Sequence, residues 1–147
     1  MNKSILSITA LSLAFLGFIS SCKKEETSFP ADLISPEITI VSPPPAKDTT
    51  INGQVYQIYS SFSAGSNVPI NLEISDNVGL DSIFVEVIDS TTLAKLFVGT
   101  WFSAQKSLSI DTGFVAPNIN SICSIKVEAY DQNGNVLGRV RAFGINP

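Results

Sequence analysis

Histidine is absent from this 147-residue sequence, and cysteine occurs only twice, at Cys22 and Cys123. Without histidine the chain cannot build a Ser-His or Cys-His catalytic dyad or an imidazole zinc site. Charged residues make up 15% of the sequence, fewer than the roughly 25% of an ordinary soluble domain. The sequence also lacks a glycine-rich phosphate loop and a G-x-S-x-G motif. Because these signatures of catalysis are missing, we expect that the chain is not an enzyme.

Positive charge is scarce as well. The sequence has 9 Lys and Arg residues against 13 Asp and Glu residues, which gives a formal net charge of −4. A nucleic-acid-binding domain needs a basic surface to neutralise phosphates. We therefore expect no nucleic-acid partner.

The first 21 residues have the character of a signal peptide. Lys3 is the only charged residue before Lys23, and the segment from Ile5 to Ile19 is apolar with small polar interruptions. A positive start, an apolar stretch of about 15 residues and small residues at its end are typical of a cleaved export signal. A transmembrane helix would need about 20 apolar residues, so a permanent anchor is the weaker interpretation.

The end of this segment, Ile19-Ser20-Ser21-Cys22, resembles the bacterial lipobox. The resemblance implies that the sulfur of Cys22 carries a diacylglycerol and that Cys22 becomes the first residue of an acylated mature chain. An ordinary secreted protein with a cysteine at the cleavage site is the alternative. The next residues, Lys23-Lys24-Glu25-Glu26, resemble the surface-export signal of Bacteroidetes lipoproteins, although any solvated tether would also be charged. We expect an outer-membrane lipoprotein that is either periplasmic or surface-exposed. Its lipid anchor attaches it to the membrane.

Downstream of the signal we expect a flexible tether over residues 22–36 and one folded domain over residues 37–147. The domain sequence alternates in the period of two that a β-strand shows. Asn52-Gly53 between β-forming residues predicts a hairpin. We expect one strand from 93 to 102, or a pair of strands bent at Gly99, and a short strand from 107 to 110 that Asp111-Thr112-Gly113 closes. About seven to nine short strands predict an antiparallel β-sandwich, with a small closed barrel as the alternative.

Three strands carry the clearest one-sided patterns, and each predicts a buried face. The inward residues expected on these strands are Val68, Ile70, Leu72 and Ile74 on the first, Ile83, Val85 and Val87 on the second, and Ile125, Val127 and Ala129 on the third. Cys123 shares the parity of Ile125, so we expect it to be a small buried hydrophobic residue and not a reactive thiol.

Two segments resemble bacterial immunoglobulin-like domains. Residues 74–83 are similar to the passage of that family between strands B and C, and residues 127–135 are similar to its passage from strand F into the F–G turn. The resemblance implies a single all-β, antiparallel immunoglobulin-like β-sandwich over residues 37–147. Gly134 lies in the second passage, where the Asn-Gly-Asn sequence predicts a turn with a positive φ.

The same two turns supply the candidate metal ligands Asp76, Asn77, Asp131 and Asn133. In an immunoglobulin-like sandwich the B–C and F–G loops lie at one end, and Ca²⁺ prefers carboxylate and amide oxygens. We predict a weak Ca²⁺ site with a Kd on the order of 10⁻⁴–10⁻³ M and no other cofactor. The alternative is that both loops are ordinary turns whose Asp and Asn side chains cap their own backbones.

Adjacent aromatic residues give the candidate ligand-binding residue. Trp101 and Phe102 have opposite parity in a strand, and we expect Phe102 to point inward and Trp101 to point at least partly outward. The function that we predict is a non-enzymatic binding or interaction module with an unknown protein or glycan partner. The alternative is a glycan-binding accessory lipoprotein of a polysaccharide-uptake system, which needs an aromatic patch open to solvent.

Overall fold

A computed structural model of the chain describes residues 32–147, apart from the side chain of Tyr56. Residues 32–147 form one compact unit. The expected signal peptide, Cys22 and the tether up to residue 31 therefore lie outside the described residues. Residues 32–147 contain no helix that is long and apolar enough to span a membrane.

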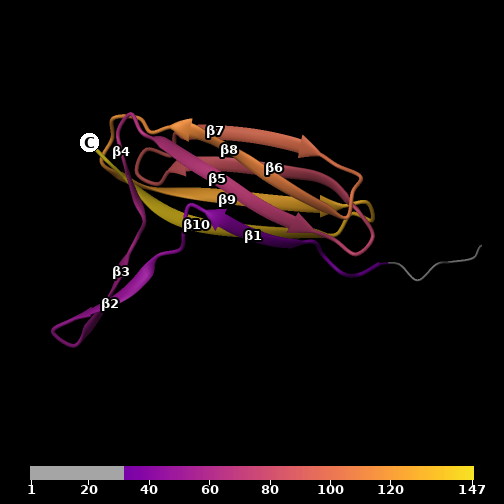
Figure 1. Cartoon of the computed structure of the whole chain (residues 1–147), viewed down its shortest axis with the longest axis horizontal. Helices are drawn as coiled ribbons and strands as arrows, with labels where there is room; N and C mark the ends of the chain where they lie inside the picture. The colour runs from indigo at the N-terminus through magenta and orange to yellow at the C-terminus, as the bar shows by residue number, and fades with distance from the viewer. Residues whose placement is uncertain (1–31) are drawn as a thin grey trace, which may run out of the picture. The chain divides into compact units, whose positions relative to one another are not determined.

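Residues 32–147 form ten strands (Figure 1). The strands are β1 (Glu37–Ser42), β2 (Lys47–Ile51), β3 (Gln54–Ile58), β4 (Ser61–Ser63), β5 (Asn67–Ser75), β6 (Leu80–Asp89), β7 (Lys95–Phe102), β8 (Ser107–Val115), β9 (Ser121–Asp131) and β10 (Val136–Asn146).

Two sheets build the body of this unit. One sheet has the order β1-β5-β8, and the other has the order β4-β10-β9-β6-β7. Neighbouring strands in both sheets are antiparallel, except that β4 runs parallel to β10. If β1 is strand A, the first order is A-B-E, and β10-β9-β6-β7 of the second sheet is G-F-C-C′, with β4 as an additional strand at its edge. This is the arrangement of an immunoglobulin-like sandwich. The all-β immunoglobulin-like fold expected from the sequence is therefore confirmed.

The core lies between the two sheets and is built from alternate residues of each strand. On β5 the side chains of Val68, Ile70, Leu72 and Ile74 are all 2% exposed or less. From the facing sheet, β6 buries Ile83, Val85 and Val87, and β9 buries Ile125, Val127 and Ala129. Cys123 is fully buried and its thiol is free, as expected. The period of two in the sequence thus places each apolar face in the core.

Strand β8 is longer than the sequence predicted. It continues through Asp111-Thr112-Gly113 to Val115, because it pairs with β5 from Asn67 to Ser75 along its whole length. Gly113 is needed there for a close approach and not for a turn. A Cβ atom at Gly113 would lie 2.6 Å from the backbone oxygen of Val68. The expected strand end at residues 111–113 was therefore wrong.

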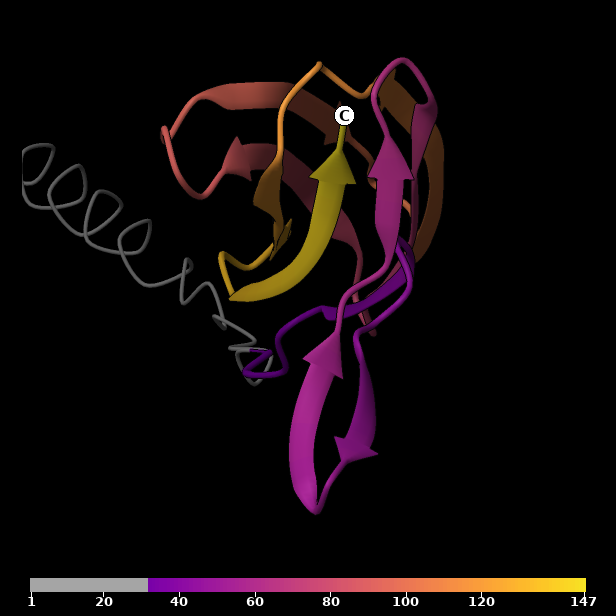
Figure 2. The ribbon, with the colours of Figure 1, turned by 90° about the vertical axis from the view of Figure 1, so that its left-hand side faces the viewer.

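Strands β2 and β3 form a separate two-stranded sheet, which we call the hairpin arm (Lys47–Ile58). Within residues 32–147 the arm pairs with no strand of the sandwich, and it projects away from the two sheets (Figures 1 and 2). Its turn is the expected Asn52-Gly53, with φ values of 52° and 79°. At the base of the arm, the Nη1 atom of Arg141 donates hydrogen bonds to the backbone oxygens of Ile40 and Pro43.

Candidate functional site

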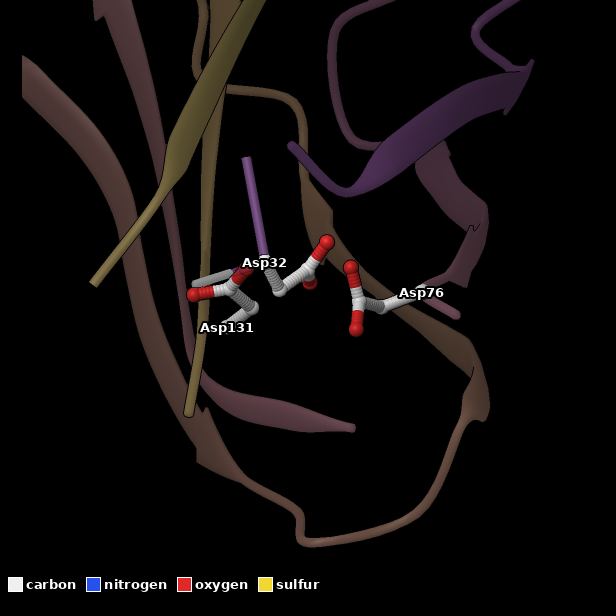
Figure 3. Close-up of side chains that lie close together, drawn as sticks. All are labelled: Asp32, Asp76 and Asp131. Atoms are coloured by element: carbon white, nitrogen blue, oxygen red, sulfur yellow. The ribbon is translucent and has the colours of Figure 1, made fainter. Parts of the chain in front are cut away.

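Three aspartates from distant parts of the chain meet at one end of the sandwich. Asp32 precedes β1, Asp76 follows β5, and Asp131 ends β9. One carboxylate oxygen from each lies within 4.8 Å of the other two (Figure 3). We call these three residues the aspartate cluster.

Asp76 holds the turn between β5 and β6. Its Oδ2 atom accepts hydrogen bonds from the backbone N–H groups of Val78 and Gly79, both at 2.7 Å. Aspartate favours this position because its side chain can cap its own turn. The second oxygen, Oδ1, is buried and has no hydrogen-bond partner in the described part of the chain.

Asp131 organises the turn between β9 and β10 and is only 3% exposed. Its Oδ1 atom accepts hydrogen bonds from the backbone N–H groups of Asn133 and Asn135, at 2.9 and 2.7 Å. Its Oδ2 atom accepts one from Nδ2 of Asn135 at 2.7 Å. Burial raises the pKa of Asp131, but the hydrogen bonds, led by that of the Asn135 side chain, leave the pKa below its ordinary value. Asp131 is therefore a carboxylate at neutral pH.

Asp32 is held against both turns by asparagine side chains. Nδ2 of Asn77 donates to Oδ1 of Asp32 at 3.2 Å, and Nδ2 of Asn135 donates to the backbone oxygen of Asp32 at 2.9 Å. Pro36, a few residues further on, is among the fully buried side chains. Residues 32–36, which the sequence analysis assigned to the tether, thus contact the sandwich. The other oxygen of Asp32, Oδ2, is buried without a partner among the described residues.

The candidate ligands predicted from the sequence are brought together only in part. Asp76 and Asp131 meet as expected. Asn77 contacts the cluster by donating its amide hydrogen to Asp32, while Asn133 contributes its backbone N–H and has an exposed side chain. Sequence reasoning missed Asp32 and the positioning role of Asn135. The available signal was topological, since strand A of such a sandwich starts at the end where the B–C and F–G loops lie.

Trp101 lies on the inner face of β7, contrary to expectation. It pairs with Ile83, which is fully buried, and its partly buried side chain packs against the core. Phe102 is the outward residue, at 78% exposure. The expected orientations were wrong because the register of an edge strand follows its neighbour β6, and parity alone cannot decide between two adjacent aromatic residues.

The two cysteines lie in different parts of the chain. Cys22, the candidate lipidation site, lies outside the described residues. Burial, followed by the negative charge of Asp89, raises the pKa of the Cys123 thiol to about 11. A thiol in this setting is not a nucleophile at neutral pH.

No protein-family model and no curated protein matches this sequence. Several solved structures are similar to the chain. CopC from Methylosinus trichosporium OB3b has 13% identity and a TM-score of 0.38, over 60% of this chain and 84% of that chain. The superoxide reductase neelaredoxin from Ignicoccus hospitalis has 6% identity and a TM-score of 0.45, over 77% and 81%. Murine CRIg has 11% identity and a TM-score of 0.38, over 75% and 97%.

These similarities correct one expectation from the sequence. The missing histidine and catalytic motifs led us to expect that the chain is not an enzyme. The similar structures include a superoxide reductase, which is an enzyme. The expectation that the chain is not an enzyme is therefore wrong.

Proposed function

We propose that this chain is an outer-membrane lipoprotein, acylated at Cys22, that presents its β-sandwich as a binding module for another protein. Two features support the proposal. The lipobox-like Ile19-Ser20-Ser21-Cys22 supports the anchor. The hairpin arm supports the binding role, and it is the single observation that carries it.

The arm has the properties of a recognition element. Isolated two-stranded hairpins are only marginally stable in water. This hairpin nevertheless exposes three apolar side chains, Ile51, Val55 and Ile58, at 55 to 67% of their surface. Beside its base lies a pocket of about 330 Å³ lined by Pro44, Pro45, Lys47, Ile58, Tyr59 and Ser60. Exposed apolar residues at the end of an extended arm favour a partner that covers them.

The chemistry of the arm indicates the kind of partner. Each strand of the arm pairs only with the other strand along the described chain, so each keeps one edge of backbone N–H and C=O groups without a neighbouring strand. An extended protein segment can add to such an edge, with main-chain hydrogen bonds for affinity and side-chain contacts for specificity. The arm also leaves the sandwich on the side away from the loops of Asp76 and Asp131, where the chain enters the fold (Figure 1).

The anchor is tested with a pair of cysteine variants. Cys22→Ala should remove labelling by radioactive palmitate and move the protein from the membrane fraction to the aqueous fraction. Cys123→Ala is the matched control and should keep both the label and the membrane location. If Cys22→Ala stays in the membrane fraction with its signal segment removed, the lipoprotein proposal is wrong.

The arm is tested by photo-crosslinking in living cells. A photoreactive amino acid at Ile58 should give a discrete protein adduct, and Val55→Asp in the same chain should abolish it. The control is the same photoreactive residue at Val140, which is 68% exposed on β10. An adduct of equal yield at Val140, or an Ile58 adduct that survives Val55→Asp, would contradict the role of the arm.

The alternative of a glycan-binding accessory lipoprotein needs an aromatic patch open to solvent. Trp101 packs against the core, whereas Phe102 is 78% exposed and Phe84 is 42% exposed. This alternative therefore stays open, and it rests on Phe102 and Phe84 instead of Trp101.

A further inference from the structure

The outer edge of β7 is a free strand edge in the described part of the chain. β7 is the last strand of its sheet and pairs only with β6. The backbone N–H of Ser103, just after β7, donates to the backbone oxygen of Asp81, next to β6 residue Ser82, at 3.1 Å. Because hydrogen-bonded pairs alternate along an antiparallel ladder, the odd-numbered residues of β7 from 97 onward bond to β6. The backbone N–H and C=O groups that point away from the sheet are therefore those of Val98, Thr100 and Phe102.

This edge lacks the usual protection of an edge strand. Natural sheets protect their edges with charged side chains, with prolines or with very short strands. The segment Leu96–Phe102 has no charged residue and no proline, and it belongs to a strand of eight residues. The side chains of Val98 and Phe102 are 62% and 78% exposed. A long apolar edge of this kind indicates that another strand pairs with it.

The other edges of the two sandwich sheets are protected within residues 32–147. β4 is only three residues long, and β8 has the exposed Asp111 at its centre. Beyond its pairing with β4, the edge of β10 carries Arg139 and Arg141. β1 is followed directly by prolines 43–45, and the Arg141 side chain donates to the backbone oxygen of Ile40. The edge of β7 is thus the exception in this sandwich.

We propose that two copies of this chain pair through β7, antiparallel and about a two-fold axis, so that two five-stranded sheets join into one continuous sheet. The axis passes beside Gly99. Val98 of one copy then lies opposite Thr100 of the second copy, and Leu96 lies opposite Phe102. In this register the outward N–H and C=O groups of the two strands face each other and can bond. The proposal does not depend on the anchor or on the hairpin arm.

The charges beside β7 favour a second copy as the partner. The chain has a net charge of −4, so two copies repel each other unless their contact is neutral or complementary. Residues 96–102 are neutral, and Lys95 at the start of β7 forms an ion pair with Glu86. At the other end of the edge lies the exposed Asp81, bonded through its backbone to Ser103. Antiparallel pairing brings the Lys95 end of each copy to the Asp81 end of the other, so opposite charges meet twice.

The assembly closes at two copies. A two-fold contact uses the same edge of both partners, and the remaining edges of the sandwich are protected. β7 lies at the opposite end of the sheet order from β4, the strand that follows the hairpin arm. The dimer therefore leaves the arms of both copies free.

The first test measures the mass of the full chain in detergent by sedimentation velocity. We expect twice the monomer mass at about 100 μM protein, which populates a dimer with a micromolar Kd. Thr100→Lys places a charge in the middle of the edge and should give the monomer mass. Because Thr100 is exposed, this variant should keep the circular dichroism spectrum of the unmodified chain. Val140→Lys, at an exposed position of β10, is the matched control and should keep the dimer.

Three results would overturn the proposal. The first is the monomer mass for the unmodified chain, which would leave a glycan or another protein as the partner of this surface. The second is a double mass that persists in Thr100→Lys, because two acylated chains can share one detergent micelle without pairing. The third is an equal loss of the dimer in Val140→Lys, because the contact would then not be specific to β7.

Hydrogen exchange at single amides separates edge pairing from contact through the face of the sheet. Pairing should slow the exchange of the Val98 and Phe102 amides in the unmodified chain relative to Thr100→Lys. The amides of Gly99 and Trp101 bond to β6 within each copy and should exchange slowly in both chains. Equally fast exchange of Val98 and Phe102 in the two chains would overturn the proposal, whatever the measured masses.

Discussion

Gly99 in the centre of β7 should be intolerant of even one added methyl group. A Cβ atom at this position would lie 2.3 Å from Cη2 and 2.6 Å from Cζ3 of Trp101, because the indole ring lies across the glycine. Both distances are far below van der Waals contact. In Gly99→Ala the ring must therefore leave its place or push the strand aside.

The loss in free energy of unfolding follows from the packing that the Trp101 ring would lose. Trp101 is partly buried against the core, and overpacking of this kind costs about 1–3 kcal/mol. With a urea m-value of about 1–3 kcal/mol/M, the unfolding midpoint should fall by roughly 1 M. Trp101 is the single tryptophan of the sequence, so its fluorescence reports on this ring alone. Emission should shift to longer wavelength, and quenching by acrylamide should increase.

Gly138→Ala on β10 is the matched control. The nearest heavy atoms to a Cβ atom there are 3.9 Å away, which is ordinary contact. The free energy of unfolding of this variant should be unchanged or raised by up to about 1 kcal/mol, because alanine restricts the unfolded chain. Its urea midpoint should therefore stay the same or rise. If Gly99→Ala matches this control in both midpoint and fluorescence, Trp101 does not lie across β7.

Four further outcomes are expected. Gly134→Val should lower the free energy of unfolding by about 1–2 kcal/mol in a urea titration, because Gly134 has a φ of +86° with open space around it and the cost is backbone strain. Phe143→Ala should cost about 3–5 kcal/mol in the same titration, because the fully buried ring packs edge-on against Phe62 at 5.8 Å. The hydrogen bonds from Ser121, then Thr92 and Thr91, lower the pKa of Asp89 from 3.8 to about 2, so its contribution to stability should be present above about pH 4 and lost as the pH falls toward 2. Urea midpoints across this range should fall less steeply in Asp89→Asn. In a Cys22→Ala chain, the Cys123 thiol should not react with Ellman's reagent at pH 8 until the protein is unfolded, because its pKa is raised to about 11.

Much of the fold could be predicted from the sequence because the buried strands alternate strictly. Val68 to Ile74 on β5 and Ile125 to Ala129 on β9 each place one apolar face in the core, and register then follows from burial. The Asn52-Gly53 turn was equally clear, since few residue pairs adopt positive φ at two successive positions. These features are local, so a single sequence contains them.

Features that depend on neighbouring strands could not be predicted. The length of β8 follows from its pairing with β5, and local turn residues at Asp111-Thr112-Gly113 gave the opposite indication. The orientation of Trp101 follows from the register between β7 and β6. In both cases the partner strand decides, and sequence periodicity does not identify the partner.

The sequence predicted two of the three residues of the aspartate cluster, and the third depends on contacts between distant segments. Asp76 and Asp131 lie in recognisable turns, and the fold class placed those turns at one end. Asp32 lies in a polar, proline-flanked stretch that resembles a linker, and the contact between Asn135 and Asp32 spans 103 residues of sequence. Only the three-dimensional arrangement assigns Asp32 to the cluster.

The anchored-module proposal is tested most directly by the mass of the N-terminal peptide of the protein recovered from membranes. We predict a chain that begins at Cys22 and carries a thioether-linked diacylglycerol on its sulfur. A membrane-derived chain that begins at Cys22 or at a later residue without a lipid would contradict the proposal.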